Sequence, residues 1–318
     1  MRTEAAAGHR GYFHETAFYG SDEEFLAIVV PFLQGGLAAG EPTVVALGER
    51  NTELVRSAMA ATPHLSFLHG QYVRPASVIK SFHKVLAGHV AHGAQQIRIV
   101  GEVPHPGVGM PWEWWARYEA AVNHAFNGFP LWGLCPYDTR ITSDRVLDDV
   151  ARTHPYLATT DGRHVVNDRY IDPAVFLSQP RSRTDPLETS LPLIDLVDPT
   201  PATARRAVLD AGRATHLAAA DIDDLVYAVS EVVTNALCHG RPPVRFRLWS
   251  SVDRIVATVT DQGDGPSDPF AGLVPAAEAS AGGLGLWITH QICSDATLGR
   301  SGEGFTIRLI AGVPSPAA

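Results

Sequence analysis

The chain has 318 residues, of which 25 are Lys or Arg and 34 are Asp or Glu, so its formal net charge is −9. This acidic balance argues against a general nucleic-acid binder, and a composition that is 45% hydrophobic and 19% charged excludes wholesale disorder. The length predicts two domains, while the absence of a signal-peptide pattern, of a membrane-spanning apolar run and of paired cysteines predicts a cytoplasmic protein with reduced thiols.

The first half of the sequence alternates between helices and short apolar strands. Ser21 is a hydroxyl N-cap followed by three acids, which predicts the start of a helix. We then expect strands at 43–47, 65–68, 97–100 and 131–134, and helices at 51–60, 77–91 and 112–126. This alternation favours an α/β fold in which helices cover both faces of a parallel or mixed sheet.

A polar segment divides the chain. Residues 178–190 contain Pro180 and Pro186, several hydroxyl residues and almost no apolar side chain. Such a composition is typical of a linker. We therefore expect a boundary near residue 183, with one domain at 1–182 and a second at 183–318.

Beyond this boundary the expected strands follow one another more closely. The patterns predict helices at 203–217, 222–239 and 284–296, and strands at 244–249, 254–260 and 305–310. Consecutive strands joined by short turns favour an antiparallel sheet with helices on one face, which is a two-layer α/β sandwich.

The helix at 222–239 has one apolar and one polar side. Its apolar residues fall within an arc of roughly 140°: Ile222, Leu225, Val226, Val229, Val232, Val233, Ala236 and Leu237. Glu231 and Asn235 fall on nearly the opposite side, one turn apart, so both can act on one ligand. A solvated polar face explains this pair equally well.

Two glycine-rich segments follow. Asp261-Gln-Gly-Asp-Gly265 ends a strand, where glycines let a flat ligand approach the backbone and the Asp261 carboxylate can accept a hydrogen bond from an exocyclic amine. After a Pro/Gly/Ala-rich loop at 266–281, Gly282-Gly-Leu-Gly285 precedes a helix, whose free N–H groups suit a phosphate. Each segment taken alone is explained equally well by a structural turn.

Taken in order, these segments resemble the N, G1 and G2 boxes of the GHKL ATPase superfamily. The matching residues are Glu231-Val-Val-Thr-Asn235 with His239-Gly240, then Asp261-x-Gly263-x-Gly265, then Gly283-Leu-Gly285-Leu-Trp287. The resemblance covers about residues 190–310 and is greatest to the anti-sigma-factor serine kinases. It implies the histidine-kinase-like (Bergerat) ATPase fold, with ATP and Mg²⁺ as cofactors.

The resemblance also implies a role for each matching residue. Asn235 would hold the Mg²⁺ that bridges the phosphates, and Glu231 would be the general base for the attacking hydroxyl. Asp261 would bind the adenine amine, with support from Thr306. Gly263 and Gly265 would permit close approach, and Gly283 and Gly285 would close on the phosphates.

The function implied in this way is that of a serine/threonine protein kinase. Its partners would be an anti-anti-sigma (STAS-type) protein, a sigma factor, or both, with no direct nucleic-acid or membrane contact, and the chain could form a homodimer. A histidine kinase would need a long dimerisation hairpin bearing a phosphoacceptor, and His216, near the end of the helix at 203–217, lacks the expected acidic neighbour. Two alternatives stay open: a non-catalytic ATP-dependent partner-binding switch, and an atypical sensor histidine kinase.

The first half, over about residues 10–160, resembles the MEDS (DcmR-like) sensory domains, which are relatives of RecA-like P-loop ATPases. The matching segments are His14-Glu-Thr-Ala-Phe-Tyr19, 31–42, Cys135-Pro-Tyr-Asp138 and Thr153-His-Pro-Tyr156. No GxxxxGK[ST] motif occurs in it, so a Walker phosphate loop is lacking. The resemblance implies a RecA-like three-layer domain that responds to a small molecule of unknown identity.

Candidates for the sensory pocket are His14, Tyr19, Glu102, Trp112, Cys135 and His154, with Trp114 and Trp115 beside them. Core packing is the simpler explanation for at least two of the three tryptophans. His14, His154 and Cys135 also allow a metal site, but no two of them have the spacing of metal ligands. Cys135, which precedes Pro136, is most simply a buried residue at the end of a strand.

Overall fold

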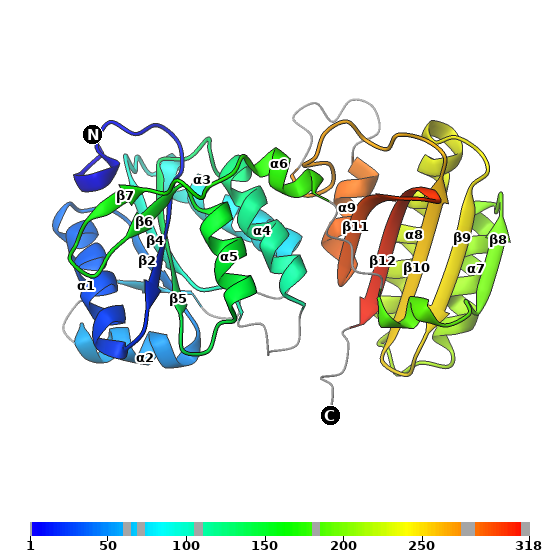
Figure 1. Cartoon of the computed structure of the whole chain (residues 1–318), viewed down its shortest axis with the longest axis horizontal. Coiled ribbons are helices and arrows are strands. Elements are labelled where there is room, and N and C mark those ends of the chain that lie inside the picture. The colour runs from blue at the N-terminus through cyan, green and yellow to red at the C-terminus, as the bar shows by residue number, and fades with distance from the viewer. Residues whose placement is uncertain are drawn as a thin grey trace. The chain divides into compact units, whose positions relative to one another are not determined.

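The computed structural model describes residues 2–59, 65–68, 74–104, 111–179, 185–274 and 284–312. The chain divides into two compact units, Met1–Leu177 and Ser178–Ala318, each with its own sheet (Figure 1). The predicted fold class, one three-layer and one two-layer α/β unit, is confirmed. The division at residues 182 and 183 stays a prediction. None of the described helices is both long and apolar enough to cross a membrane.

The first unit is built on a seven-stranded sheet of order β3-β2-β4-β5-β1-β6-β7. The described strands pair in parallel, except for β6 and β7. They are β1 (Phe13–Tyr19), β2 (Thr43–Ala46), β3 (Ser66–Phe67), β4 (Ile97–Gly101), β5 (Leu131–Asp138), β6 (Tyr156–Ala158) and β7 (His164–Val166). The four predicted strands are confirmed, and β1, β6 and β7 are additional.

Helices cover both faces of this sheet. One face packs against α1 (Asp22–Ala38) and α2 (Glu49–Ala58). On the other face lie α3 (Pro75–Ala91), α4 (Trp112–Ala125) and α5 (Asp144–Thr153), which contact one another in that order. The predicted cap of α1 is confirmed, because the Ser21 side chain accepts a hydrogen bond from the Glu24 amide. Short helices η1 (Glu4–Ala6) and α6 (Pro173–Ser178) complete the unit.

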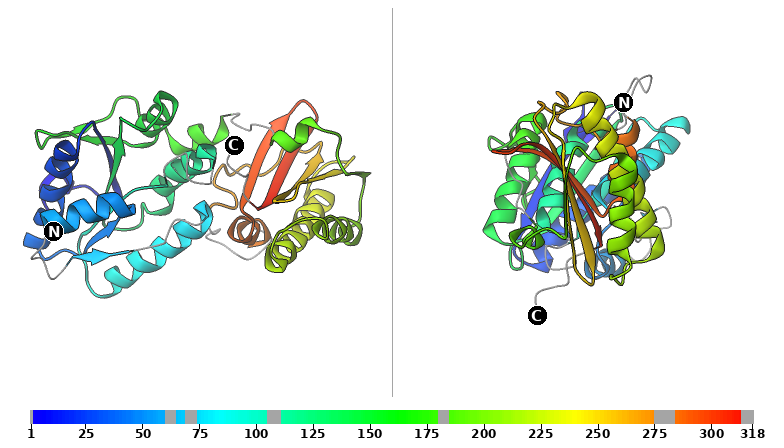
Figure 2. Two further views of the ribbon diagram at one scale, coloured as in Figure 1. Left: turned by 90° about the horizontal axis from the view of Figure 1, so that it is seen from below. Right: turned by 90° about the vertical axis from the view of Figure 1, so that its right-hand side faces the viewer.

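The second unit is a two-layer sandwich. Its antiparallel sheet has the order β11-β12-β10-β9-β8, and its strands are β8 (Ile194–Val197), β9 (Arg245–Ser250), β10 (Arg254–Asp261), β11 (Asp295–Ser301) and β12 (Gly304–Gly312). Helices α7 (Pro201–Gly212), α8 (Ala219–His239) and α9 (Leu284–Ile292) lie on one face of this sheet (Figure 2).

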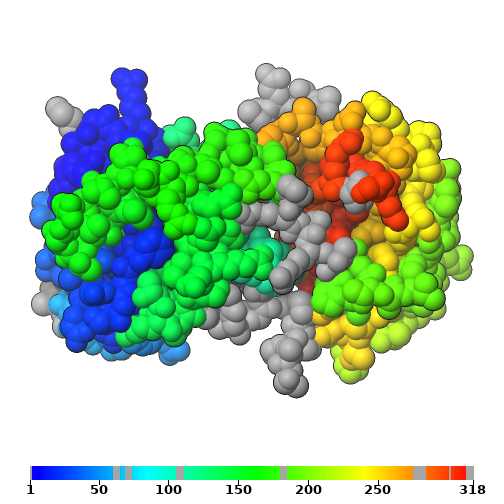
Figure 3. Space-filling view, viewed as in Figure 1, coloured from blue at the N-terminus to red at the C-terminus, as the bar shows by residue number. Residues whose placement is uncertain are grey.

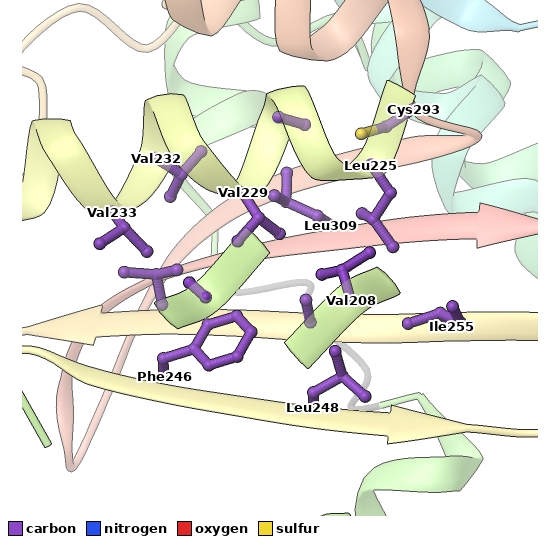
Figure 4. Packing of buried hydrophobic residues seen from close by; sticks show 14 of the residues in the cluster. Val208, Leu225, Val229, Val232, Val233, Phe246, Leu248, Ile255, Cys293 and Leu309 are labelled. Carbon is purple, nitrogen blue, oxygen red and sulfur yellow. The ribbon is translucent and has the colours of Figure 1, made fainter. Parts of the chain in front are cut away.

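The buried side of α8 determines which of its residues remain available for a ligand. Leu225, Val229, Val232 and Val233 point from α8 toward the sheet and pack in one aliphatic core with strand residues (Figure 4). Leu237 was expected on this side but is 46% exposed, because in the last turn of the helix only Ala236 reaches the core. The opposite side of α8 is left partly open.

The predicted helix at 284–296 is wrong over its last part. In the structure α9 ends at Ile292, and β11 starts at Asp295. The Ser294 amide donates to the Ile310 carbonyl, and β11 then pairs with β12 over its whole length. Pairing at the edge of the sheet therefore overrides the local helical pattern.

The expected linker at 178–190 is also wrong in part, because its second half is fastened to the second unit. A 3₁₀ helix, η2 (Pro186–Thr189), is capped by Asp185. Asp185 forms an ion pair with Arg254 of β10 at 3.0 Å, and Glu188 accepts two hydrogen bonds from Arg308 of β12. Figure 3 shows this segment, in green, on the surface of the second unit.

Candidate functional site

The carboxylate of Asp261, at the end of β10, is held in a fixed position. The residue is 6% exposed, and its Oδ1 accepts hydrogen bonds from the amides of Gly263 at 2.6 Å and Arg241 at 3.2 Å. No residue that the structure describes donates a hydrogen bond to Oδ2. A fixed carboxylate with an unused acceptor is suited to bind an amino group of a ligand.

Glycines surround this carboxylate. A Cβ on Gly240 would lie 2.5 Å from Asp261 Cγ, and one on Gly263 would lie 2.6 Å from Asp261 Oδ1. Gly265 has a φ of +72°, and a Cβ there would lie 2.3 Å from the ring of Phe305. Any larger residue would therefore strain the backbone or displace the groups around the carboxylate. The roles of Gly263 and Gly265 toward a nucleotide stay predictions.

Helices α8 and α9 bring a second pair of predicted residues together. Glu231 and Asn235 are both half-buried and lie one turn apart on α8. A Cβ on Gly285, in the first turn of α9, would lie 2.4 Å from Glu231 Oε2. The start of α9 is thus beside the Glu231 carboxylate. Gly283 and residues 275–281 of the expected loop lie outside the described residues.

Thr306 is not beside Asp261, contrary to the support expected from it. Its hydroxyl is hydrogen-bonded to that of Thr260 at 2.8 Å, and these two residues are paired across β10 and β12. Asp261 is paired with Phe305 instead. Because successive residues of a strand point to opposite faces, the side chains of Thr306 and Asp261 project from opposite faces of the sheet.

Charged side chains hold the segment that follows β10. Arg300 donates to the Gly263 carbonyl at 2.8 Å and also pairs with Asp264. Arg241 reaches the same Asp264 carboxylate at 3.1 Å. These pairs are largely exposed, so each contributes ~1 kcal/mol or less to stability. We infer that they orient the backbone, and no sequence motif pointed to them.

In the first unit, four polar side chains gather between the sheet and its helices. His14 of β1, Glu119 of α4, Cys135 of β5 and His154, directly after α5, each offer one donor atom, and these atoms all lie within 4.8 Å of one another. His14, Glu119 and His154 are at most 1% exposed, and Cys135 is partly exposed. We call these four residues the buried cluster. Glu119 was not among the predicted residues, because it is a single acid on an ordinary helix.

Distances within the buried cluster are short. His14 Nε2 lies 3.5 Å from Cys135 Sγ and 3.7 Å from Glu119 Oε2, and His154 Nε2 lies 3.5 Å from the same Oε2. Burial raises the pKa of Glu119 to about 7 and lowers the pKa of His154 to about 4. Burial also lowers the pKa of His14 and raises the pKa of Cys135. The surroundings therefore favour the uncharged form of each group.

Tyr19, Glu102 and Trp112 form a second set outside the buried cluster. The Asn51 amide donates to Tyr19 Oη at 2.9 Å and to Glu102 Oε2 at 3.2 Å. Glu102 and Trp112 line a small pocket with Tyr137. The predicted sensory residues thus fall into two sets, of which only the buried cluster converges on one point.

The tryptophans at the start of α4 belong to the core. Trp112, Trp114 and Trp115 are at most 5% exposed. The Trp112 indole donates to Asp149 Oδ2 at 3.0 Å. Their burial agrees with the core-packing interpretation, although Trp112 also borders the small pocket.

Comparison with known proteins gives a match in each unit. The family of MEDS domains (methanogen/methylotroph, DcmR sensory domain) matches residues 13–155, and the histidine kinase-like ATPase domain family matches residues 198–311. The transcriptional repressor DcmR of Methylorubrum extorquens is 25% identical over 153 residues, which cover 44% of this chain and 57% of DcmR. The serine-protein kinase RsbW of Bacillus velezensis is 32% identical over 104 residues, which cover 28% of this chain and 63% of RsbW. The chain thus spans less than two thirds of either relative.

Solved structures give weaker similarities. The RsbU and RsbW domains of Rv1364c from Mycobacterium tuberculosis align with 21% identity and a TM-score of 0.29, over 40% of this chain and 34% of that one. The histidine kinase domain of the E. coli osmosensor EnvZ aligns with 19% identity and a TM-score of 0.24, over 41% of this chain and 94% of that one.

Proposed function

Because the chain joins a MEDS domain to a histidine kinase-like ATPase domain, we propose that it is an ATP-binding regulator of the anti-sigma kinase type. The ATPase domain phosphorylates a serine or threonine of a STAS-type anti-anti-sigma partner. The MEDS domain controls this step in response to a small-molecule signal. The protein works in the cytoplasm. Because its net charge is −9, it acts through protein partners and not through direct contact with nucleic acid.

The fixed Asp261 carboxylate is the observation that carries this proposal. Its Oδ1 is engaged by two backbone amides, so Oδ2 faces a ligand with no competing donor among the described residues. Adenine has an exocyclic amine that can donate to such an oxygen. Gly240 and Gly263 leave the space beside the carboxylate free of side chains, which a flat base requires.

The residues on α8 suit the phosphate end of the nucleotide. ATP supplies the phosphoryl group, and Mg²⁺ neutralises part of its negative charge. Asn235 offers an amide oxygen, which is the hard donor that Mg²⁺ prefers. Gly285 offers a helix N-terminus beside Glu231, in a position where a side chain would collide with the carboxylate.

Glu231 acts as the general base of the transfer. It accepts the proton of the partner's hydroxyl while that oxygen bonds to the γ-phosphorus, and the bond to the bridging oxygen breaks so that ADP leaves. The added phosphate brings negative charge to the partner's surface and changes its docking. The similarity to RsbW, which is named a serine-protein kinase, supports this reaction.

Transfer of label from [γ-³²P]ATP·Mg²⁺ tests the proposal. The full chain is incubated with each STAS-type protein of the same organism, and the labelled product is treated with acid and with base. We expect acid-stable label on one of these proteins and none on the chain itself. The Asp223→Asn variant controls for the loss of a carboxylate from α8. It should transfer label as the unmodified chain does, because Asp223 is exposed on α8 away from the proposed site.

Other outcomes would decide between the remaining candidates. ATP-dependent binding of a STAS-type protein without any transfer of label would support a non-catalytic switch. Acid-labile label on the chain itself would support a histidine kinase and contradict the serine-kinase proposal. No binding of ATP by the unmodified chain would refute both the site and the function.

A further inference from the structure

We propose that His14, Glu119, Cys135 and His154 bind one divalent transition-metal ion, and that zinc is the ion their donors fit best. This metal site lies in the first unit and goes beyond the proposed function, which does not depend on it. Two imidazole nitrogens, a thiolate and a carboxylate are the donor types that zinc takes in proteins.

Both histidines are held in the form that a metal needs. The side-chain NH₂ of Asn123 donates to backbone carbonyls, including that of Thr153 at 2.8 Å, so its Oδ1 must accept from His14 Nδ1 at 3.0 Å. His154 Nδ1 lies 2.8 Å from the Val150 carbonyl, which can only accept. Each Nδ1 therefore carries the proton, and each Nε2 presents a lone pair to the buried cluster.

The observation that points most directly to a bound ion is the environment of His154 Nε2. This nitrogen is fully buried and makes no hydrogen bond to any described residue. Glu119 Oε2 lies 3.5 Å from it, which is too far for a good hydrogen bond. A buried unsatisfied nitrogen costs about 1–3 kcal/mol in general, whereas a metal ion would use its lone pair.

Three of the separations between donor atoms are close to those of tetrahedral coordination, and all four donor atoms lie within 4.8 Å of one another. Ligands at zinc distances of about 2.0–2.3 Å and tetrahedral angles lie about 3.3–3.6 Å from one another. The two histidine–glutamate separations are 3.5 and 3.7 Å, and the separation between His14 Nε2 and Cys135 Sγ is 3.5 Å.

Charge balance explains how these groups can bind an ion inside the unit. A divalent ion together with the thiolate of Cys135 and the carboxylate of Glu119 has no net charge, and the histidines bind as neutral rings. Burial of a neutral assembly avoids the large desolvation penalty of an isolated charge. On binding, the Cys135 thiol releases its proton to solvent, as does Glu119 where it is protonated.

The surroundings of the buried cluster orient its ligands. The Tyr137 hydroxyl donates to Glu119 Oε1 at 2.7 Å, which leaves Oε2 directed at the histidines. Tyr12 stacks on the His14 ring with centroids 4.5 Å apart. Such outer contacts fix ligand geometry in metal sites.

Cobalt substitution tests the site directly. The full chain is freed of metal with a chelator and titrated with Co²⁺, which reports thiolate coordination as a charge-transfer absorption and tetrahedral geometry as visible bands. We expect saturation at one Co²⁺ per chain and displacement by Zn²⁺. The charge-transfer band should vanish in Cys135→Ser and persist in Cys238→Ser, an exposed cysteine that is followed by a histidine.

Further results with these variants would support or overturn the proposed metal site. Tyr137→Phe should weaken Zn²⁺ binding about 10-fold to 100-fold, because Glu119 loses its orienting hydrogen bond. A band that persists in Cys135→Ser, or that disappears in Cys238→Ser, would overturn the assignment. If Cys135→Ser does not fold, as judged by circular dichroism, the unmodified chain decides: saturation without a thiolate band, or no saturable Co²⁺ binding, refutes the site.

Discussion

The two units arrange their polar groups in opposite ways. The buried cluster takes one side chain from each of four places in the chain and encloses them. The proposed nucleotide site takes three continuous motifs and keeps its space free with glycines. An ion that stays bound needs fixed side-chain donors and an exact charge balance, whereas a large ligand that exchanges needs exposed backbone. This contrast fits a metal ion that stays bound in the first unit and a nucleotide that exchanges in the second.

The largest effect should come from Glu231→Gln, which tests whether the second unit carries out chemistry at all. Glutamine keeps the size of the side chain but cannot accept the hydroxyl proton, so we expect phosphate transfer to slow by about 10²–10⁴-fold. ATP affinity should change little. Transfer at the full rate in this variant, measured with [γ-³²P]ATP, would remove Glu231 from the mechanism.

Asp261→Asn tests whether the Asp261 carboxylate binds the adenine ring of ATP. Asparagine can keep the Oδ1 contacts to the amides of Gly263 and Arg241 while it replaces the Oδ2 acceptor with an NH₂ donor. Loss of a hydrogen bond to a charged group costs about 1.5–3 kcal/mol, so ATP should bind about 10-fold to 100-fold more weakly. GTP, which has a carbonyl oxygen in place of the adenine amine, should lose less. If calorimetry finds the same ATP affinity in Asp261→Asn and in the unmodified chain, this role of Asp261 is contradicted.

Gly285→Ala tests whether the second site depends on free space. The new methyl group would lie 2.4 Å from Glu231 Oε2 and would displace that flexible carboxylate. We expect transfer to slow about 10-fold with little change in ATP affinity, since a misplaced base affects the reacting atoms more than binding. Gly302→Ala is the matched control, because apart from its chain neighbours no described residue has an atom within 4 Å of a Cβ at Gly302. Equal rates in the two variants would argue against a role for the contact between α9 and the Glu231 carboxylate.

The smallest effect concerns His164, a residue of the first unit that lies outside the buried cluster. A hydrogen bond from His164 Nδ1 to Glu15 Oε2, at 2.7 Å, raises the pKa of His164 above its ordinary value of 6.5. Because the folded state holds this proton more tightly, the stabilisation is complete below pH 6.5 and is lost as the pH rises through the raised pKa. His164→Gln should therefore be less stable than the parent at pH 6 and nearly equal at high pH. Urea midpoints across this range check the trend, with His92→Gln as control, and a constant difference would exclude the titration.

Local patterns predicted those parts of the molecule whose structure depends on neighbouring residues. The apolar side of α8 follows from its spacing, because nearly every residue on that side packs on one sheet. The glycine-rich segments around Gly263 and Gly285 are continuous motifs that can be read without knowledge of distant contacts.

Features that depend on distant contacts were not predicted. Residues 295–301 become a strand only through pairing with β12, and Glu119 gains its role from strands and helices elsewhere in the chain. The support expected from Thr306 for Asp261 is not seen, because the register of β12 against β10 decides which side of the sheet each residue takes. The acids of the expected linker had arginine partners that no local pattern reveals.

The attachment of η2 has a practical consequence for where the second unit can be separated from the rest of the chain. The family match begins at residue 198, but Arg254 and Arg308 lie on the sheet with almost no exposure and rely on Asp185 and Glu188 as counter-ions. A fragment that starts at residue 198 would also lack the edge strand β8. A fragment of the second unit should therefore start no later than Asp185, because a shorter one would leave both arginines without these counter-ions.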